Sequence, residues 1–569
     1  MKKVLSLVVV LIIAICMLTL AACGVTSENV LPSQETEQST KTDYVAAEAA
    51  VDTTFDNVTE ATDDFSIATE DGEYIADGGV YTIVKGGTYT LSGYLEGQVV
   101  VDAPDEEVTL ELSGATIVCS TDSPIKATDA EKVEISAKKD TENVIKDTRS
   151  EKTSDDDAQG AGAISAKCDL KLKGNGILVI EADYNNGVHT SKDLTIKNLS
   201  LKVTAVNNAL KGKKSVTIES GTVVAISTKG DGIETEDTDV SSKGKQRGTI
   251  TIADGMVAVY AAGDGVQASY DFVMDGGSLS VYTGSYSSYT ASGAQVDSYK
   301  GIKVGNELTV NAGSIAVHSY DDGLHADYGE ALENGATGQG NVTVNGGKIE
   351  IVVYSPTKST FGGRMGPMGR GGFGGFGGQQ EVTGSDAIHA DNTLTVTGGT
   401  IVIDSAYEGL EASHIVISGG DISVYATDDG VNACAKITNS PTILVSGGYL
   451  FVTVPTSGDT DGIDSNGTYK QTGGVVIACG PGSASGGMGG GAWALDTDRG
   501  VTLTGGALIL FGGMENTPSI SGVTKTVCSS GNVSAGSHTV TVGEESYTVE
   551  LKYATGGCVV YGAGKATLK

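Results

Sequence analysis

The sequence is poor in several residue types on which common folds and sites depend. Of its 569 residues only 9 are proline, 6 are histidine and 1 is tryptophan, and aromatic residues make up 5%. With so few aromatic rings, the core must be filled mainly by Val, Ile, Leu and Ala, which suits a thin core between short strands. The 8 cysteines show no CxxC spacing, which argues against a cysteine zinc site and favours single buried thiols over a disulfide framework.

Basic residues are also scarce. There are 37 Lys and Arg against 71 Asp and Glu, and the formal net charge is −34. Nucleic acid is excluded as a partner, because binding it requires a basic surface that releases counterions. An anionic ligand would be repelled as well, unless cations bridged the two surfaces.

Only one long apolar run is present, at Val4–Leu20. Lys2 and Lys3 precede it, and it ends in Leu-Ala-Ala-Cys at Cys23, the pattern of a bacterial lipoprotein signal. The sequence therefore predicts a signal peptide at residues 1–22 and lipidation of Cys23. The alternative is an ordinary secretory signal with a cysteine there by chance.

The segment that follows, residues 23–71, is rich in Ser, Thr, Glu, Ala and Asp and shows no sustained periodicity. We expect it to be a flexible acidic tether. No second apolar run of spanning length follows, so the body should lie at the extracellular face of the plasma membrane, held by the lipid anchor only.

Two short patterns repeat along the body, and the first contains many of the 81 glycines. It is an alternating apolar segment broken by a Gly pair, as in Leu394–Ile403 and Val501–Leu510. Each example predicts two short strands joined by a tight turn, where Gly permits a positive φ.

The second pattern is an acid or Asn, then Gly, an aliphatic residue, any residue x and a small residue. Successive copies begin about 22 residues apart, for example at Asn186 and Asn208, and at Asp386 and Glu408. A fixed period with three short strands describes one coil of a parallel β-helix. A β-propeller, the main rival, needs a period about twice as long.

We therefore predict an all-β, right-handed parallel β-helix of about 10–12 coils over residues 72–535, with N- and C-terminal caps. Residues 536–569 should form the C-terminal β cap, because open strand edges invite aggregation. We expect the protein to be a monomer.

In the second pattern the aliphatic and small residues point inward, so residue x points outward. Stacked coils should align these residues into one row, which we call the polar ladder and expect to bind carbohydrate. The alternative is that they are ordinary polar residues of an exposed strand. The members of the polar ladder are His189, Lys211, Glu234, Gln267, Lys303, His325, His389, Glu411, Asn432 and Asp464.

Acidic residues flank the polar ladder, and we call them the corner acids. Stacked carboxylates repel one another unless a cation lies between them, and Ca²⁺ takes six to eight oxygen ligands in flexible geometry. The sequence therefore predicts bound Ca²⁺, although each Asp alone is also explained by capping a turn. His325 and His389 hint only weakly at zinc. The candidate metal ligands are Asp321, Asp322, Asp327, Asp386, Asp391, Glu408, Asp428, Asp429 and Asp461.

The N-terminal motifs Gly79–Gly93, Gln98–Asp102 and Val108–Ile117, followed by the two repeating patterns, resemble a clostridial family of carbohydrate-binding β-helix proteins. The resemblance covers residues from about 75 to 515. It implies a pectate-lyase-like right-handed β-helix, binding to cellulose or polygalacturonate (pectin), bound calcium and no demonstrated lyase chemistry.

The leading hypothesis is therefore a cell-surface protein that binds a polysaccharide without cleaving it. A lyase would need a base, and Lys211 and Lys303 are the best candidates, because no Arg belongs to the polar ladder. A polygalacturonase-type hydrolase would need paired acids, for which Asp321–Asp322 and Asp428–Asp429 are candidates. A structural adhesin without glycan specificity is the remaining alternative.

Overall fold

The computed structural model describes residues 55, 57–151, 160–284, 299–331, 337–354, 384–456, 460–483 and 492–569. The expected signal peptide, Cys23 and most of the expected tether lie outside the described residues. Every regular element in these ranges is a β-strand, so the all-β prediction is confirmed there. The described part of the chain contains no helix long and apolar enough to span a membrane.

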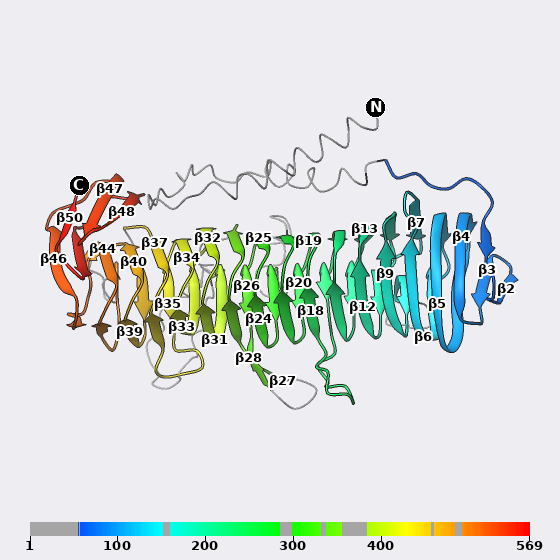
Figure 1. Cartoon of the computed structure of the whole chain (residues 1–569), viewed down its shortest axis with the longest axis horizontal. Helices are drawn as coiled ribbons and strands as arrows, with labels where there is room; N and C mark the ends of the chain where they lie inside the picture. The colour runs from blue at the N-terminus through cyan, green and yellow to red at the C-terminus, as the bar shows by residue number, and fades with distance from the viewer. Residues whose placement is uncertain are drawn as a thin grey trace, which may run out of the picture.

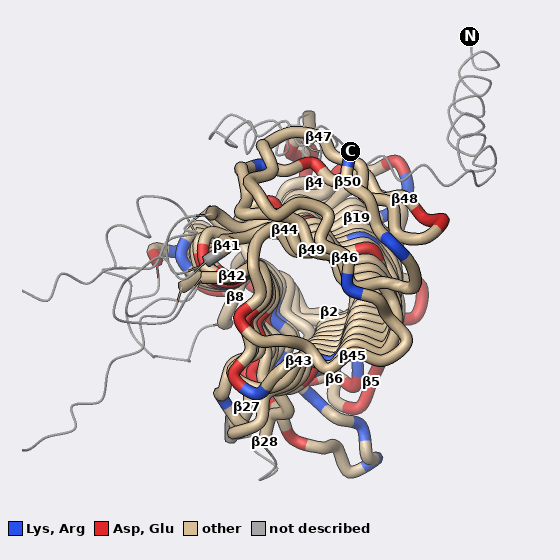
Figure 2. Tube along the Cα trace, turned by 90° about the vertical axis from the view of Figure 1, so that its left-hand side faces the viewer, with Lys and Arg blue, Asp and Glu red and all other residues tan. Residues whose placement is uncertain are grey.

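The strands of successive coils pair in parallel and form three rows around one core, which gives the molecule the shape of a rod (Figure 1). Viewed along the rod, the coils superpose closely (Figure 2). The first row contains β3 (Val80–Ile83), β5 (Gln98–Cys119), β6 (Ile125–Ala137), β8 (Gly162–Ala166), β11 (Asn186–Thr190), β14 (Leu210–Gly212), β17 (Ile233–Glu234), β20 (Val266–Ala268), β23 (Ile302–Val304), β26 (Leu324–Ala326), β31 (Ile388–Val396), β33 (Leu410–Ile417), β35 (Val431–Ala433) and β38 (Ile463–Ser465).

The second row shares the long strands β5, β6, β31 and β33 with the first, because each of these strands continues past the corner, where its pairing shifts in register. Its other strands are β4 (Gly87–Glu96), β9 (Asp169–Gly174), β12 (Asp193–Lys197), β15 (Ser215–Ile218), β18 (Thr249–Ile252), β21 (Asp271–Met274), β24 (Glu307–Val310), β29 (Asn341–Val344), β36 (Thr442–Val445), β39 (Thr468–Gln471), β43 (Val501–Leu503) and β45 (Ser519–Ile520).

The third row begins with the ends of β4 and β5. It continues with β7 (Glu142–Asp147), β10 (Ile177–Ala182), β13 (Leu199–Ala205), β16 (Gly221–Ser227), β19 (Met256–Ala261), β22 (Ser278–Thr283), β25 (Ser314–Ser319), β30 (Lys348–Val353), β32 (Thr400–Ser405), β34 (Asp421–Tyr425), β37 (Tyr449–Thr453), β40 (Val475–Cys479) and β44 (Ala507–Phe511).

The third row thus holds fifteen strands in unbroken parallel pairing, so the prediction of ten to twelve coils was too low. The parallel pairing of this row already begins at β4 and β5, well before Asn186, where the first copy of the second pattern stands.

Alternation of side chains builds the core. In β13, Leu199, Leu201 and Val203 are fully buried, while the residues between them are only half-buried. This period of two is what the sequence predicted for strands with one face on a core. The inward side chains of the three rows merge into one continuous apolar cluster.

Glycine serves two different needs at the corners. In the Gly pairs the second residue has a positive φ, for example 85° at Gly399 and 89° at Gly420, as predicted. In the second pattern Gly265 has no such φ. A Cβ added there would lie 2.1 Å from Cγ1 of Val281, so glycine is needed for close packing against the core.

Antiparallel strands close both ends of the rod, so the large sheet is mixed. At the N-terminal end β1 (Ser66–Ala68) pairs with β4, and β2 (Tyr74–Asp77) pairs with β3. At the other end β49 (Cys558–Gly562) pairs with both β44 and β46 (Thr524–Ser529). A separate antiparallel sheet holds β47 (Gly536–Val542), β48 (Glu545–Leu551) and β50 (Ala566–Leu568).

Two hairpins project from the rod, β27 (Tyr328–Ala331) with β28 (Thr337–Gln339) and β41 (Gly482–Ser483) with β42 (Ala492–Trp493).

Part of the segment expected to be a tether packs on the rod. Phe55 is buried against Tyr260 and Tyr282 on the outer side of the third row. The amide of Thr59 donates to a carboxylate oxygen of Glu142 at 2.9 Å. Strand β1 also lies before residue 72, where the folded body was expected to begin. The chain from Phe55 onward is therefore attached to the coils.

Candidate functional site

The polar ladder is continuous across the first row. Each of its ten members is the register partner of the next one, from the pair His189 and Lys211 to the pair Asn432 and Asp464. The repeat therefore placed all ten correctly relative to one another. Acidic segments recur on the side of the tube that carries β8, which belongs to the same row (Figure 2).

The middle of the polar ladder differs from the open face that was expected. His325, His389, Glu411 and Asn432 are only 6–9% exposed, whereas the other six members are half-buried. Their side chains do point away from the apolar core. They are covered because neighbouring ladder side chains and corner acids pack against them, and the prediction of a flat solvent-facing surface is wrong for this stretch.

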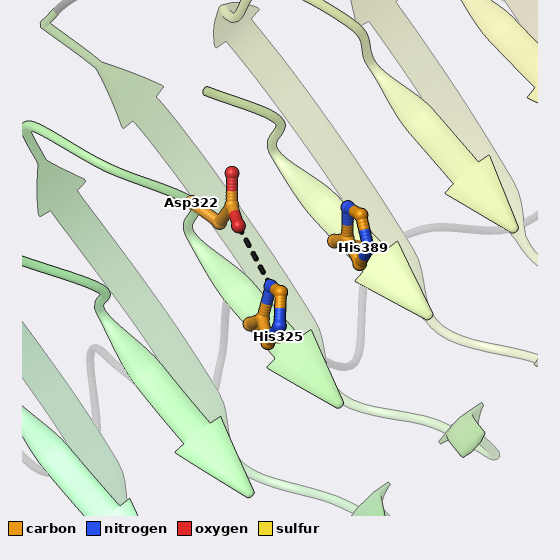
Figure 3. A group of neighbouring side chains, drawn as sticks. All are labelled: Asp322, His325 and His389. Carbon is orange, nitrogen blue, oxygen red and sulfur yellow. Dashed lines mark hydrogen bonds and ion pairs between the residues drawn. The ribbon is translucent and has the colours of Figure 1, made fainter. Parts of the chain in front are cut away.

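His325 lies between two carboxylates. Its Nδ1 is 2.7 Å from Oδ2 of Asp322 (Figure 3). Its Nε2 is 2.7 Å from Oδ1 of Asp327. Burial alone would raise the pKa of Asp327, but the bond with His325 and the nearby Lys303 lower it to about 2. For Asp322, burial is likewise outweighed, by Lys300 and His325, and its pKa falls well below the usual value. This end of the site therefore carries ionised acids with matching cations.

His389 stacks on His325 in the next coil, with ring centroids 4.5 Å apart (Figure 3). Its Nδ1 faces two carboxylates, Oδ2 of Asp386 at 2.9 Å and Oε2 of Glu411 at 2.8 Å. Its Nε2 lies 3.2 Å from Oδ1 of Asp391. Burial alone would lower the pKa of His389, but these three carboxylates raise it well above its usual value.

Lys436 completes this cluster, and the sequence did not indicate it. Its Nζ lies 2.9 Å from Oε2 of Glu411 and 2.7 Å from Nε2 of His389. Lys436 stands in the connection after β35, outside both repeating patterns, so no periodicity points to it.

Beyond His389 the acids outnumber the cations. Burial, followed by the charges of Asp386 and Glu411, raises the pKa of Glu408 well above its usual value. Burial and then the charge of Asp464 do the same for Asp429. Asn432 donates from Nδ2 to Glu408 at 2.9 Å, while its buried Oδ1 has no hydrogen-bond partner. This end of the site therefore has more carboxyl groups than cations and an unused oxygen.

The corner acids also hold the backbone of neighbouring coils together. Oδ1 of Asp322 accepts the amide of Asp386 at 2.7 Å, and Oδ1 of Asp429 accepts the amide of Asp461 at 2.8 Å. Such bonds support the alternative that one oxygen of each of these acids caps a turn and does not bind a metal ion. Asp391 likewise accepts the amide of Tyr328, whereas Asp321 caps its own turn by accepting the amide of the next residue, Asp322. Asp428 instead interacts with Tyr407, whose pKa it helps to raise.

The lysines near the polar ladder are held in ion pairs. Lys211 lies 2.9 Å from Glu234 and 3.2 Å from Glu236. Lys300 lies 2.8 Å from Asp321. Burial alone would lower the pKa values of Lys211, Lys300 and Lys436, yet the neighbouring carboxylates raise all three. These amines stay protonated at neutral pH.

Comparison with known proteins bears on this arrangement. A family model described as carbohydrate-binding domain-containing protein matches residues 77–353 and 330–430. A carbohydrate-binding domain-containing protein of Acetivibrio thermocellus is 37% identical over 126 residues, which are 22% of this chain and 44% of that relative. The chain thus spans less than half the length of this relative.

A solved structure of a polysaccharide lyase-like protein from C. thermocellum, a gadolinium derivative, is 30% identical. The match covers 44% of this chain and 94% of the other, with a TM-score of 0.38. The family model covers more than half of the residues and includes the polar ladder from His189 to Glu411. The chain belongs to the family of carbohydrate-binding domain-containing proteins.

Proposed function

We propose that the outer face of the first row binds an extended polysaccharide and does not cleave it. The observation that carries the proposal is the unbroken register of the polar ladder, which repeats hydrogen-bonding side chains at the coil spacing of about 4.8 Å. An extended glycan also repeats its hydroxyl groups along its length, so several coils can contact one chain. Cellulose and polygalacturonate are the candidate ligands, and membership of a carbohydrate-binding family supports this class.

We propose further that the parallel coils form a right-handed β-helix. Parallel strands of one sheet are joined by right-handed crossovers in nearly all known cases, because twisted strands pack back onto the sheet only with that hand. Each connection between coils here joins parallel strands.

Calcium is the proposed cofactor, and the donor set fits it. Glu408, Asp429 and Asn432 offer only oxygen ligands, and the orphaned Oδ1 of Asn432 lies within this group. Burial and then repulsion raise the pKa values of the two acids, and a divalent cation there would offset both effects. Calcium bound at this end would also let an acidic protein hold an acidic polymer.

Cleavage by β-elimination is disfavoured by the lysines. A general base must be deprotonated, whereas carboxylates keep Lys211, Lys300 and Lys436 charged. Arg149 is likewise engaged with Asp147, and Arg247 with Asp237. Lys303, the other candidate base, lies 3.5 Å from a carboxylate oxygen of Asp327. Binding without turnover is therefore preferred to the lyase alternative.

Lipidation of Cys23 after removal of residues 1–22 would hold the rod at the extracellular face of the plasma membrane. This part of the proposal rests on the sequence pattern alone.

The test is a pull-down of the full chain with insoluble cellulose and with immobilised polygalacturonate, each with Ca²⁺ and with EDTA. Gln267→Ala combined with Lys303→Ala removes two half-buried ladder side chains. Since each contact contributes on the order of 1 kcal/mol, we expect binding to weaken about tenfold or more. The control pair, Thr251→Ala with Thr309→Ala, lies on the outer face of the second row and should bind normally.

Ultraviolet absorbance of the supernatant reports unsaturated products. Their appearance would establish a lyase and refute binding without turnover. Equal binding by the two variant pairs would show that the polar ladder is not the glycan site.

A further inference from the structure

Two groups of side chains in the described ranges bring three ligand atoms within 4.8 Å of one another. They are Asp322 with His325 and His389, and Asp386 with His389 and Glu411. The two groups share His389, which is the most buried member of the polar ladder. We call these two groups together the histidine cluster. Because both groups contain His389, they offer nitrogen as well as oxygen ligands, unlike the group of Glu408, Asp429 and Asn432.

The second group is arranged around one ring nitrogen. Oxygen atoms of Asp386 and Glu411 both lie within 2.9 Å of Nδ1 of His389. This nitrogen carries at most one proton, which cannot satisfy two carboxylates equally well. A divalent cation in place of that proton would be bound by all three atoms at once. Lys436 pairs with Glu411, and its Nζ lies 2.7 Å from Nε2 and 3.4 Å from Nδ1 of the imidazole, so its ammonium group must move away when a cation binds.

The surroundings of His389 match those of a metal-bound histidine. A ligating histidine commonly donates its second ring N–H to a carboxylate, which orients the ring. Here Asp391 Oδ1 lies 3.2 Å from Nε2, opposite the two candidate carboxylate ligands. All three candidate ligands are less than 10% exposed, so few waters compete for a bound ion.

The donor types select the class of ion. Ca²⁺ and Mg²⁺ prefer oxygen ligands alone, whereas an imidazole with two carboxylates suits Zn²⁺ and its neighbours in the first transition row. We propose that Asp386, His389 and Glu411 form a binding site for a divalent cation of the Zn²⁺ class, with Asp391 as the positioning residue of the ring. The imidazole of His325 stacks on that of His389, with ring centroids 4.5 Å apart, and offers a further nitrogen ligand.

The site is tested on the full chain by equilibrium dialysis against ZnCl₂, with and without excess CaCl₂, and by thermal unfolding with each salt. We expect one tightly bound Zn²⁺ that excess Ca²⁺ does not displace, and a higher Tm with Zn²⁺. Co²⁺ in place of Zn²⁺ should give visible absorption bands from the mixed nitrogen and oxygen ligands.

Two histidines provide a matched pair of variants. His389→Gln should weaken Zn²⁺ binding by more than about tenfold. His414→Gln should leave it unchanged, because His414 lies on the outer face of the second row, where it bonds Thr442. Tm values measured in EDTA show whether each variant is folded. If H389Q is unfolded, Glu411→Gln replaces it in the same assay with the same expected loss.

Absence of Zn²⁺ binding to the wild-type chain, or equal binding by H389Q and H414Q, would overturn the proposal. The test of the zinc site is independent of the test of the proposed glycan binding. Loss of glycan binding in the Gln267 and Lys303 variant leaves the zinc measurement unaffected, because neither residue belongs to the cluster.

Discussion

Asp231 begins the copy of the second pattern that contains Glu234, and it both stabilises and destabilises the rod. Its Oδ1 accepts the amide of Asp264 at 2.8 Å, which joins two coils. Burial, followed by the charges of Asp264 and Glu234, raises its pKa to about 7. The hydrogen bond needs only an oxygen atom, whereas the negative charge opposes burial.

Asp231→Asn should therefore stabilise the protein at pH 8. A carboxyl with a raised pKa in the folded state contributes stability that is intact below its unfolded pKa, near 4, and is lost as the pH rises to about 7. Allowing for partial exposure, we expect a gain on the order of 1 kcal/mol at pH 8 and none at pH 4. Urea denaturation at the two pH values measures this change in the free energy of unfolding.

The control is Asp254→Asn, in an exposed turn where Asp254 Oδ1 accepts the amide of Gly255. It should change stability by less than about 0.5 kcal/mol at either pH. A lower urea midpoint for D231N than for the wild type at pH 8 would contradict the assignment.

Gly265→Ala should destabilise the coil stack by about 1–3 kcal/mol, because the new methyl group would overlap Cγ1 of Val281 in a filled core. Gly531→Ala is the matched change at a glycine with no atom within 4 Å of the added Cβ, and it should be nearly neutral. Thermal unfolding of both variants gives the comparison. Equal Tm values would show that the backbone at this corner shifts enough to accommodate the methyl group.

At the scale of elements, the rows differ in what covers them. The third row carries outward-facing apolar and aromatic residues where the segment around Phe55 packs, including Val224, Tyr260 and Tyr282. Further along the segment, the amide of Ala61 donates to Oγ1 of Thr116 at 2.8 Å. The segment therefore runs across the outer surface of several coils and holds them together.

Phe55→Ala should loosen this segment without unfolding the coils. Loss of the buried ring costs roughly 1–3 kcal/mol locally, so amides of residues 57–64 should exchange about tenfold faster or more. Hydrogen exchange read by mass spectrometry detects this. Ile75→Ala, at a site 61% exposed, is the control and should exchange like the wild type. Unchanged exchange in F55A would mean that the segment is held by its polar contacts alone.

At the scale of the whole molecule, stacking fifteen strands about 4.8 Å apart gives a rod roughly 70 Å long. The end of such a stack offers unpaired strands to other chains. Here β49 pairs with β44, and Val540, Val549 and Leu551 of the antiparallel sheet join Ile509 and Phe511 in a second apolar cluster. The C-terminal strands therefore close the last coil.

Removal of residues 536–569 should produce concentration-dependent oligomers larger than any species of the full chain, because the edge of β44 and its apolar surface lose their cover. Size-exclusion chromatography with light scattering, run on the full and truncated chains at several concentrations, measures the mass. A truncated chain that stays monomeric over a tenfold range of concentration would disprove this role of the cap.

The sequence by itself determined the all-β fold and the register of the polar ladder. A period of two sets the direction of each side chain, and a repeat near 22 residues sets which side chains meet, so both features are local or strictly periodic. Only the tertiary structure decided the burial of His389, the approach of Lys436 and the packing of Phe55. Each of these depends on a contact between segments outside the repeat, and no pattern along the chain records which side chains will cover one another.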